Sequence, residues 1–158
     1  MRRFDKNFLR AKKLIEDGAI GTPILIKSVG RGPGLPPEWY ADLNKSNGLL
    51  AEVNSHDFDS IRWLIGSNFK QVYALADNFK LSQYKEKYPD FYDTAAVILK
   101  FENGVLGMVD GCCPATYGYD VRVEILGTEG MLQIGSKFKD AYEEGARHFV
   151  NCILTNVI

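Results

Sequence analysis

The second half of the chain is a series of short β-prone segments separated by turn residues. Five segments share this character: residues 71–79, 93–101, 105–111, 120–126 and 131–134. Asn103-Gly104 joins two of them, and Asn-Gly between two apolar runs is the strongest short-range signal for a hairpin. Strands that follow one another across tight turns pair antiparallel. This part of the sequence therefore predicts a sheet built mainly from antiparallel strands.

The remaining elements are mostly helical. They are a helix over residues 4–17, a strand over 24–29, a helix over 47–64 and a closing helix over 138–153. Residues 31–40 are rich in Gly and Pro, which are disfavoured in the interior of helices and strands. This segment is therefore predicted to be a loop between the first strand and the second helix. Helices and clustered strands in this order are typical of α+β folds. We expect an open, mainly antiparallel (mixed) sheet covered by helices on one face.

Length, charge and hydropathy restrict the class of protein. With 158 residues the chain fits one domain, and 19 basic against 20 acidic residues give a net charge of -1. This balance offers no basic surface for nucleic acid, and no apolar run is long enough to span a membrane. Cys112, Cys113 and Cys152 have no metal-like spacing and are expected to be reduced thiols. The sequence predicts a cytoplasmic protein without a metal site.

The helix predicted over residues 47–64 has two distinct stripes. Glu52, His56 and Asp59 are three or four residues apart, a spacing that makes side chains neighbours on a helix. The opposite stripe is apolar and consists of Leu50, Val53, Ile61, Leu64 and Ile65. Histidine exchanges a proton most readily near neutral pH, which suits it to acid–base chemistry. The pattern predicts a helix that packs on the sheet and presents half of an active site.

Four stretches together resemble a known family. They are residues 1–5 (Met-Arg-Arg-Phe-Asp), 18–23 (Gly-Ala-Ile-Gly-Thr-Pro), 46–64 with an acid four residues before a histidine, and 117–130 with Tyr-Gly-Tyr-Asp and Gly-Thr-Glu-Gly. In this order and spacing the chain resembles the C-terminal, substrate-binding domain of the glucose–fructose oxidoreductase/inositol dehydrogenase (Gfo/Idh/MocA) family of NAD(P)-dependent dehydrogenases. The Arg-Arg start and the Tyr-Gly-Tyr-Asp stretch favour its inositol dehydrogenase branch.

The resemblance implies an oxidoreductase acting on a CH–OH group of an inositol-like polyol or sugar, with NAD or NADP as the cofactor. Residues 1–158 would be the substrate-binding and dimerisation domain, and the N-terminal Rossmann domain would be absent from this chain. We therefore expect the chain to be inactive by itself and to bind no cofactor tightly. Its partners would be the small polyol or sugar and further copies of itself, paired through the open sheet face into a homo-oligomer.

The resemblance also assigns site residues by position. His56 would handle the proton or orient the substrate, and Glu52 would bind a hydroxyl, although each is alternatively an ordinary helix residue. Arg2 and Tyr119 would be substrate-binding, or else a solvated charge and a cross-strand aromatic residue. Asp59 would bind substrate or orient His56, or simply be solvated. No cofactor-binding residue and no metal ligand is expected.

Two departures from the family pattern matter. Glu52 stands where the family usually has Asp, and one extra methylene can shift a carboxylate by about 1 Å. Gly30, Gly32 and Gly34 alternate around Pro33 without opening a helix, so they do not form the Gly-x-Gly-x-x-Gly phosphate loop. The alternatives to a dehydrogenase domain are a stand-alone, non-catalytic dimerisation or sugar-binding module and a truncated remnant of an enzyme.

Overall fold

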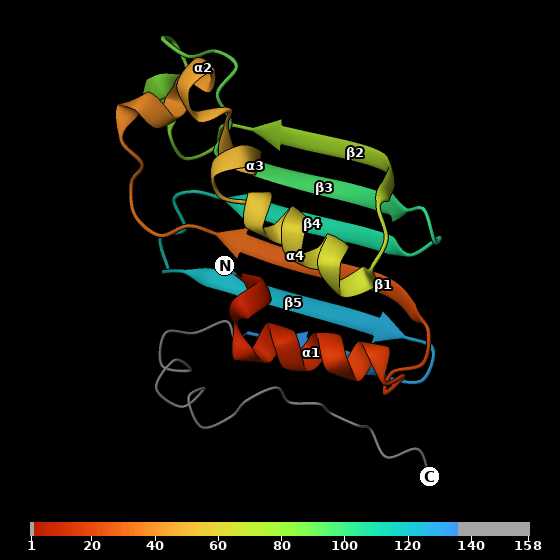
Figure 1. Cartoon of the computed structure of the whole chain (residues 1–158). Coiled ribbons are helices and arrows are strands. Elements are labelled where there is room, and N and C mark those ends of the chain that lie inside the picture. Colours follow the sequence, from red (N-terminus) through yellow and green to blue (C-terminus); the bar gives the residue numbers. More distant parts are fainter. Residues whose placement is uncertain (1, 136–158) are drawn as a thin grey trace.

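The computed structural model describes residues 2–135, which form a six-stranded open sheet (Figure 1). The strands are β1 (Pro23–Arg31), β2 (Phe69–Asp77), β3 (Thr94–Phe101), β4 (Leu106–Cys112), β5 (Asp120–Gly127) and β6 (Met131–Ile134). Their order across the sheet is β2-β3-β4-β1-β5-β6. β1 pairs in parallel with β4, and the other neighbouring strands are antiparallel. The predicted mixed, mainly antiparallel sheet is confirmed.

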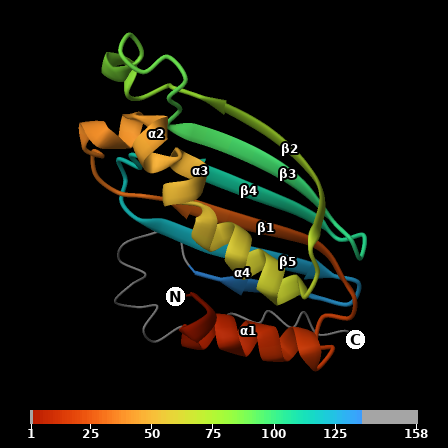
Figure 2. The ribbon, with the colours of Figure 1, turned by 45° about the horizontal axis from the view of Figure 1, so that its top comes forward.

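Helices cover one face of this sheet. They are α1 (Lys6–Glu16), α2 (Leu43–Ser46), α3 (Leu49–Glu52) and α4 (Ser55–Ile65), with 3-10 turns at Arg2–Phe4, Glu38–Ala41 and Ser82–Tyr84. α4 lies over β1 and β4, and α1 packs beside it near β6 (Figures 1 and 2). α1 begins where the Asp5 carboxylate accepts hydrogen bonds from two backbone N–H groups of the first turn. The predicted one-sided helix layer is confirmed.

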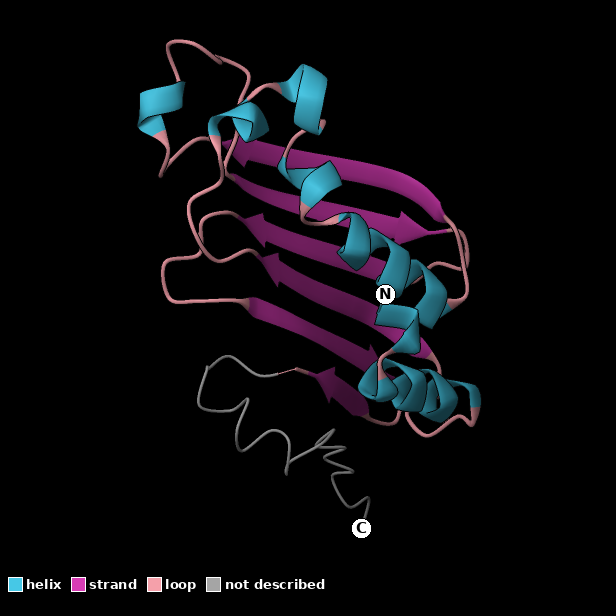
Figure 3. Ribbon diagram, turned by 60° about the vertical axis from the view of Figure 1, so that its left-hand side comes forward, coloured by secondary structure: helices cyan, strands magenta, loops and turns pink. Residues whose placement is uncertain are grey.

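Alternating burial along the strands separates the two faces of the sheet. On β3, Val97, Leu99 and Phe101 are buried, whereas Ala96 and Ile98 between them are exposed. The buried set faces α1 and α4 and forms the main hydrophobic core with them. Figure 3 shows α1 and α4 on the same side of the strands. The sheet therefore has a core face and a face that the described helices leave open.

That second face, called the bare sheet face below, is partly apolar. Its exposed apolar side chains are Tyr73, Leu75, Ile98, Leu106, Met108 and Leu126. Strand pairing places Tyr73, Ile98 and Met108 in one row across three strands. A Lys27–Glu124 ion pair of 2.9 Å lies on the same face, across β1 and β5. Contiguous exposed apolar surface of this kind commonly marks an interaction site.

A second, smaller core closes the end of the sheet next to α2 and α3. It consists of Tyr40, Ala41, Leu49, Leu81, Phe91, Ala95 and Cys113. The rings of Tyr40 and Phe91 pack edge to face with their centroids 6.0 Å apart. The fully buried Asp93 carboxylate accepts hydrogen bonds from the backbone N–H groups of Lys80 and Leu81, at 2.6 and 2.9 Å. This core fixes the position of α3 and, through it, the start of α4.

Two expectations for the helices differ from the structure or lie beyond it. The single helix predicted over residues 47–64 is wrong, because α2 ends at Ser46 and the segment is then divided into α3 and α4. The predicted apolar stripe nevertheless faces the core, with Ile61 and Leu64 fully buried. The closing helix predicted over residues 138–153 lies outside the described residues.

Candidate functional site

The break between α3 and α4 occurs at Asn54. Its backbone, at φ -93° and ψ -2°, departs from the values of a regular α-helix, and its N–H reaches the carbonyl of Leu49 five residues back. Glu52 is the last residue of α3 and His56 the second residue of α4. The two residues are therefore not neighbours on one regular helix, and the predicted stripe spacing does not apply across the break.

Two strand glycines explain why the chain breaks there. Gly30 of β1 and Gly111 of β4 are paired directly across the two strands. A Cβ atom at Gly30 would lie 2.0 Å from Asp57 Oδ2, and one at Gly111 would lie 2.0 Å from Asn54 Oδ1. The missing side chains thus leave a hollow in the sheet that the Asn54 and Asp57 side chains occupy. Asn54 turns inward to reach it, and α3 ends.

Asp57 is the most deeply buried carboxylate at this place, with no exposed surface. Its Oδ1 accepts hydrogen bonds from Ser28 Oγ and Arg2 Nη1, both at 2.6 Å, and its Oδ2 accepts one from Asn54 Nδ2 at 2.9 Å. Asn54 Nδ2 also donates to the Gly30 carbonyl at 3.1 Å. Burial of a charged group is costly unless it is paired and hydrogen-bonded, and these three donors supply that compensation.

Glu52 and His56, the predicted catalytic residues, are both exposed. Within residues 2–135 neither side chain has a hydrogen-bond or ion-pair partner. A carboxylate and an imidazole that the described residues do not engage can accept contacts from a polar ligand. The segment from α3 to α4 therefore offers an acceptor and a proton-exchanging group at one end of the sheet.

Tyr40 is a neighbouring group that the sequence did not single out as catalytic or substrate-binding. Burial, followed by the charges of Cys113 and Glu52, raises the pKa of Tyr40, so its phenol stays protonated. Its hydroxyl is buried and has no hydrogen-bond partner within the described part of the chain. Burial likewise raises the pKa of the Cys113 thiol, which keeps it protonated and unreactive.

The other predicted site residues lie in different surroundings. Arg2 is almost buried and donates to Asp57, as described above, and also to Ser60 Oγ at 3.3 Å. Asp59 is bound by Arg3, at 2.9 and 2.5 Å, and this contact holds the pKa of Asp59 below its usual value. The structure thus brings Asp59 to Arg3. Tyr119 is 51% exposed on the loop before β5.

A charged network lies beside that loop. Arg31 binds the Asp110 carboxylate, and its Nη1 donates to Tyr117 Oη at 2.9 Å. Tyr117 Oη donates to Asp120 Oδ2 at 2.8 Å, and Arg122 Nε donates to Asp120 Oδ1 at 2.7 Å. The hydrogen bond to Asp110 is the main cause that raises the pKa of Arg31. This network fixes the ends of β1, β4 and β5 around the loop that carries Tyr119.

Asn54 and Asp57 were not predicted as site residues, although their spacing from the apolar stripe could have identified them. Asp57 precedes Ile61 by four residues and Leu64 by seven, so it lies on the core side of α4. A carboxylate in that position must find donors inside the protein. Asn54 precedes Asp57 by three residues and extends the same side. The matching hollow at Gly30 and Gly111 was not recognisable, because it depends on strand pairing.

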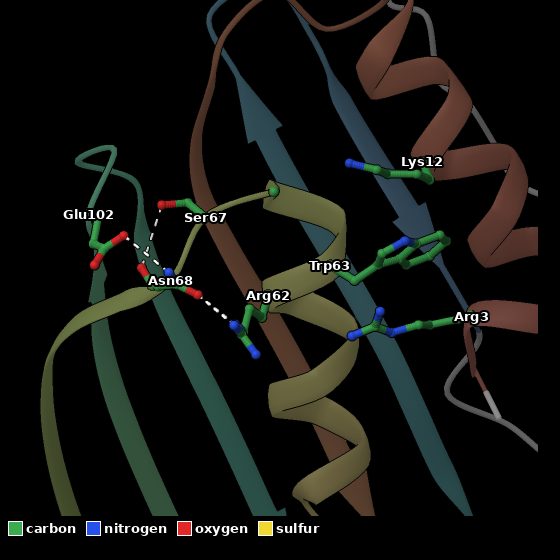
Figure 4. A pocket seen from close by; sticks show the side chains of 8 residues that line it. Arg3, Lys12, Arg62, Trp63, Ser67, Asn68 and Glu102 are labelled. Atoms are coloured by element: carbon green, nitrogen blue, oxygen red, sulfur yellow. Dashed lines mark hydrogen bonds between the residues drawn. The ribbon is translucent and has the colours of Figure 1, made fainter.

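An open concavity of about 560 Å³ lies at the C-terminal end of α4 (Figure 4), whereas Glu52 and His56 are at the junction of α3 with the start of α4. It is lined by Arg3, Lys12, Arg62, Trp63, Gly66, Ser67, Asn68 and Glu102. Its three cations already have partners. Arg3 binds Asp59, Lys12 Nζ donates to the Leu64 carbonyl at 3.3 Å, and Arg62 donates to Asn68 Oδ1. These contacts account for the charges, and we assign no ligand to the concavity.

Residues 2–135 lack two further features, a metal centre and a membrane-spanning helix. No group of three His, Cys, Asp or Glu side chains is arranged to hold a metal ion there. No helix in this part of the chain is long and apolar enough to cross a membrane.

The chain folds into an α+β domain with one bare sheet face and with two exposed polar side chains, Glu52 and His56, at the junction of α3 and α4. Residues 8–133 match the GFO/IDH/MocA C-terminal domain, and the chain belongs to this family of oxidoreductases. The resemblance drawn from the sequence motifs is confirmed.

Several relatives are named inositol dehydrogenases. The chain is 37% identical to myo-inositol 2-dehydrogenase of Thermotoga maritima, over 83% of this chain and 38% of the relative. It is 34% identical to the uncharacterized oxidoreductase YrbE of Bacillus subtilis, over 98% of this chain and 52% of that protein. The chain thus spans about half, or less, of the length of the curated relatives it matches.

Solved structures agree with this assignment. The fold is similar to a probable dehydrogenase from Thermotoga maritima, with a TM-score of 0.78 and 34% identity over 86% of this chain and 40% of that one. It is also similar to scyllo-inositol dehydrogenase from Lactobacillus casei with bound NAD(H) and scyllo-inositol, with a TM-score of 0.72 and 32% identity over 84% of this chain and 39% of the other.

Proposed function

We propose that residues 1–158 are the substrate-binding and oligomerisation domain of an NAD(P)-dependent oxidoreductase that acts on a CH–OH group of an inositol-like polyol. The observation that carries this proposal is the pair of exposed side chains Glu52 and His56 at the α3–α4 junction of a domain of this family; neither has a partner among residues 2–135. The names of the inositol dehydrogenase relatives support the substrate class.

The chemistry requires a group that takes the hydroxyl proton as hydride leaves the carbon. In this proposal His56 accepts that proton, because imidazole exchanges protons near neutral pH and the described residues leave the ring without a partner. Glu52 accepts a hydrogen bond from a second hydroxyl and so orients the ring of the polyol. Tyr119, on its exposed loop, supplies a further hydroxyl contact. Arg2 and Asp59 are engaged by Asp57 and Arg3, and they support the site through those contacts.

The cofactor supplies the hydride acceptor, and the described residues do not fit its pyrophosphate. A dinucleotide-binding turn needs a strand, three glycines and the N-terminus of a helix. Gly30 instead lies inside β1 against Asp57, and Gly32 and Gly34 precede an extended loop. We therefore propose that a separate dinucleotide-binding domain is required, and that this chain alone does not turn over.

A titration with myo-inositol tests the substrate assignment directly. In the labelled chain, the ring signal of His56 and the backbone signals of α3 and the first turn of α4 are expected to shift on addition of the polyol. Glu52→Gln and His56→Gln should each weaken the response, while Lys70→Gln should not, because Lys70 is at the start of β2, at the end of the sheet opposite α3 (Figure 1). Absence of any shift in the wild-type chain would overturn the assignment of a polyol site.

An activity assay tests the second part of the proposal. The purified chain is incubated with myo-inositol and NAD or NADP, and reduced nicotinamide is followed by absorbance. No rate above the blank is expected. A cofactor-dependent rate from this chain alone would contradict the requirement for a separate dinucleotide-binding domain.

The bare sheet face is proposed as the contact between copies of the chain. Its row of Tyr73, Ile98 and Met108 is exposed and apolar, and such surface seldom stays uncovered in a monomer. Sedimentation at tens of micromolar is expected to show a dimer or larger assembly. Ile98→Lys should dissociate it, whereas Val72→Lys should not, because Val72 is also exposed and apolar but lies on the opposite side of the sheet. A monomeric wild-type chain would refute the contact.

The bare sheet face also favours a second candidate function, a stand-alone dimerisation module. The two candidates are separated by the same measurements. Self-association together with polyol-dependent shifts at His56 supports the dehydrogenase domain. Self-association without those shifts supports the non-catalytic module.

A further inference from the structure

Two consecutive arginines tie the start of the described chain to α4. Arg2 binds Asp57, and Arg3 binds Asp59, two residues further along the same helix. The two pairs differ in burial, since the Arg2 and Asp57 side chains are 10% and 0% exposed and the Arg3 and Asp59 side chains are 43% and 49% exposed. Only the Arg2–Asp57 pair is enclosed by the protein.

The Asp57 carboxylate is gripped from three separate segments. Ser28 belongs to β1, Asn54 directly precedes α4, and Arg2 belongs to the 3-10 turn before α1. Hydrogen bonds are directional, so three of them from different sides fix the carboxylate in position and orientation. An apolar residue at the same place would pack against the sheet but would not set the rotation of the helix.

His56 directly precedes Asp57 in the first turn of α4. Consecutive side chains of an α-helix point about 100° apart, so the direction of one determines the direction of the next. Asp57 points into the hollow formed at Gly30 and Gly111, and His56 is exposed beside it. Whatever fixes Asp57 therefore fixes where the His56 imidazole is presented.

We infer that Asp57 is the positioning residue for His56, and that Arg2 acts through Asp57 rather than on the substrate. This inference rests on the proposed function in giving His56 a ligand to meet, but the placement itself is a property of the chain alone. It replaces Asp59, which Arg3 holds on the exposed side of α4, as the acid that orients the histidine. The Asn54 and Asp57 side chains, with Gly30 and Gly111 opposite them, then act together to fix the first turn of α4 and the direction of His56.

Nuclear magnetic resonance on the labelled 158-residue chain tests this inference. The chain has two histidines, and His148→Gln identifies the ring signal of His56. Asp57→Asn is the main variant. Ser28→Ala is the milder second variant, because it removes one hydrogen bond and keeps the charge pair. Arg3→Gln is the matched control, since it breaks the adjacent exposed pair on the same helix.

Without ligand, Asp57→Asn and Ser28→Ala are expected to shift the ring and amide signals of His56, while the signals of β2 and β3 stay in place. Arg3→Gln should leave His56 unchanged. With myo-inositol, the two variants should bind about tenfold more weakly, because a displaced His56 loses its hydrogen bond to the polyol and one such bond contributes roughly a factor of ten to affinity. The amide signals of β2 and β3 report a loss of folding, which would leave Ser28→Ala as the deciding variant.

The inference is overturned if His56 signals and polyol affinity in Ser28→Ala, and in Asp57→Asn where it folds, equal those of the wild type. It is also overturned if Arg3→Gln shifts His56 as strongly as they do. Failure of the proposed function has a different signature. The wild-type chain would then show no response to myo-inositol, while the ligand-free comparison at His56 would still decide the role of Asp57.

Discussion

Replacement of Arg2 by methionine measures how much the buried ion pair stabilises the fold. The guanidinium lies 2.6 Å from Asp57 Oδ1. Methionine keeps an apolar stem of similar length but removes the charge. Asp57 then retains only the neutral donors Ser28 and Asn54. Removing one partner of a buried pair costs about 3–5 kcal/mol, because it leaves a buried charge without compensation.

Equilibrium unfolding in urea, followed by circular dichroism, is the assay. With a dependence on urea of about 2 kcal/mol per M, a loss of about 4 kcal/mol lowers the transition midpoint by about 2 M. Arg3→Met is the matched control, because it removes the neighbouring cation from the exposed pair with Asp59. Exposed pairs contribute little to stability, so the control midpoint should stay close to that of the wild type.

The reasoning is refuted if Arg2→Met leaves the midpoint unchanged, or if the two methionine variants lower it equally. The first result would mean that the Asp57 carboxylate is satisfied without Arg2. The second would mean that both arginines act only through general charge or chain-end effects. A double variant that also replaces Asp57 by Asn separates the pairing energy from the cost of the orphaned charge.

Three further predictions concern other parts of the structure. Gly111→Ala should lower the free energy of unfolding by about 1–3 kcal/mol in urea titrations, because the new Cβ would lie 2.0 Å from Asn54 Oδ1. Burial opposes ionisation of Asp120, but hydrogen bonds, chiefly from Arg122, outweigh it and lower the pKa of Asp120 below its ordinary 3.8. The stability that ionised Asp120 contributes is therefore complete above pH 3.8 and is lost as the pH falls through the lowered pKa. In an acid titration, the Asp120→Asn variant should not show this loss of stability. Tyr40→Phe should leave the melting temperature unchanged or raise it, because the buried hydroxyl has no partner in the described part of the chain.

The sheet could be predicted from the sequence because its signals are local. Asn103-Gly104 joins β3 to β4, and the turn before β6 joins β5 to β6, as the sequence indicated. The apolar stripe of α4 was also readable, since Ile61 and Leu64 recur at helical spacing and both are buried. The parallel pairing of β1 with β4 was not readable, because residues 32–105 lie between these strands and the pairing is not set by a local turn.

The site was predicted only in part for the same reason. Glu52 and His56 were named from a helical spacing that the structure interrupts at Asn54. That interruption depends on Gly30 and Gly111, which become neighbours of Asn54 only when β1 and β4 pair. A helix pattern evaluated on its own residues carries no information about a hollow in the sheet below it. The exposed residues Glu52 and His56 could be named from the sequence motif. The buried residues Asn54 and Asp57 depend on how β1 and β4 pair.

The parallel pairing of β1 and β4 also explains why the site lies where it does. The one parallel register among the described strands places the two glycines side by side, so that a single hollow accommodates both Asn54 and Asp57. A shift of one residue in this register would place a side chain in the hollow and exclude the carboxylate. α4 could then pack on the sheet through Ile61 and Leu64, but the rotation of its first turn would no longer be fixed. The register of two strands thus determines the direction in which the exposed His56 side chain leaves α4.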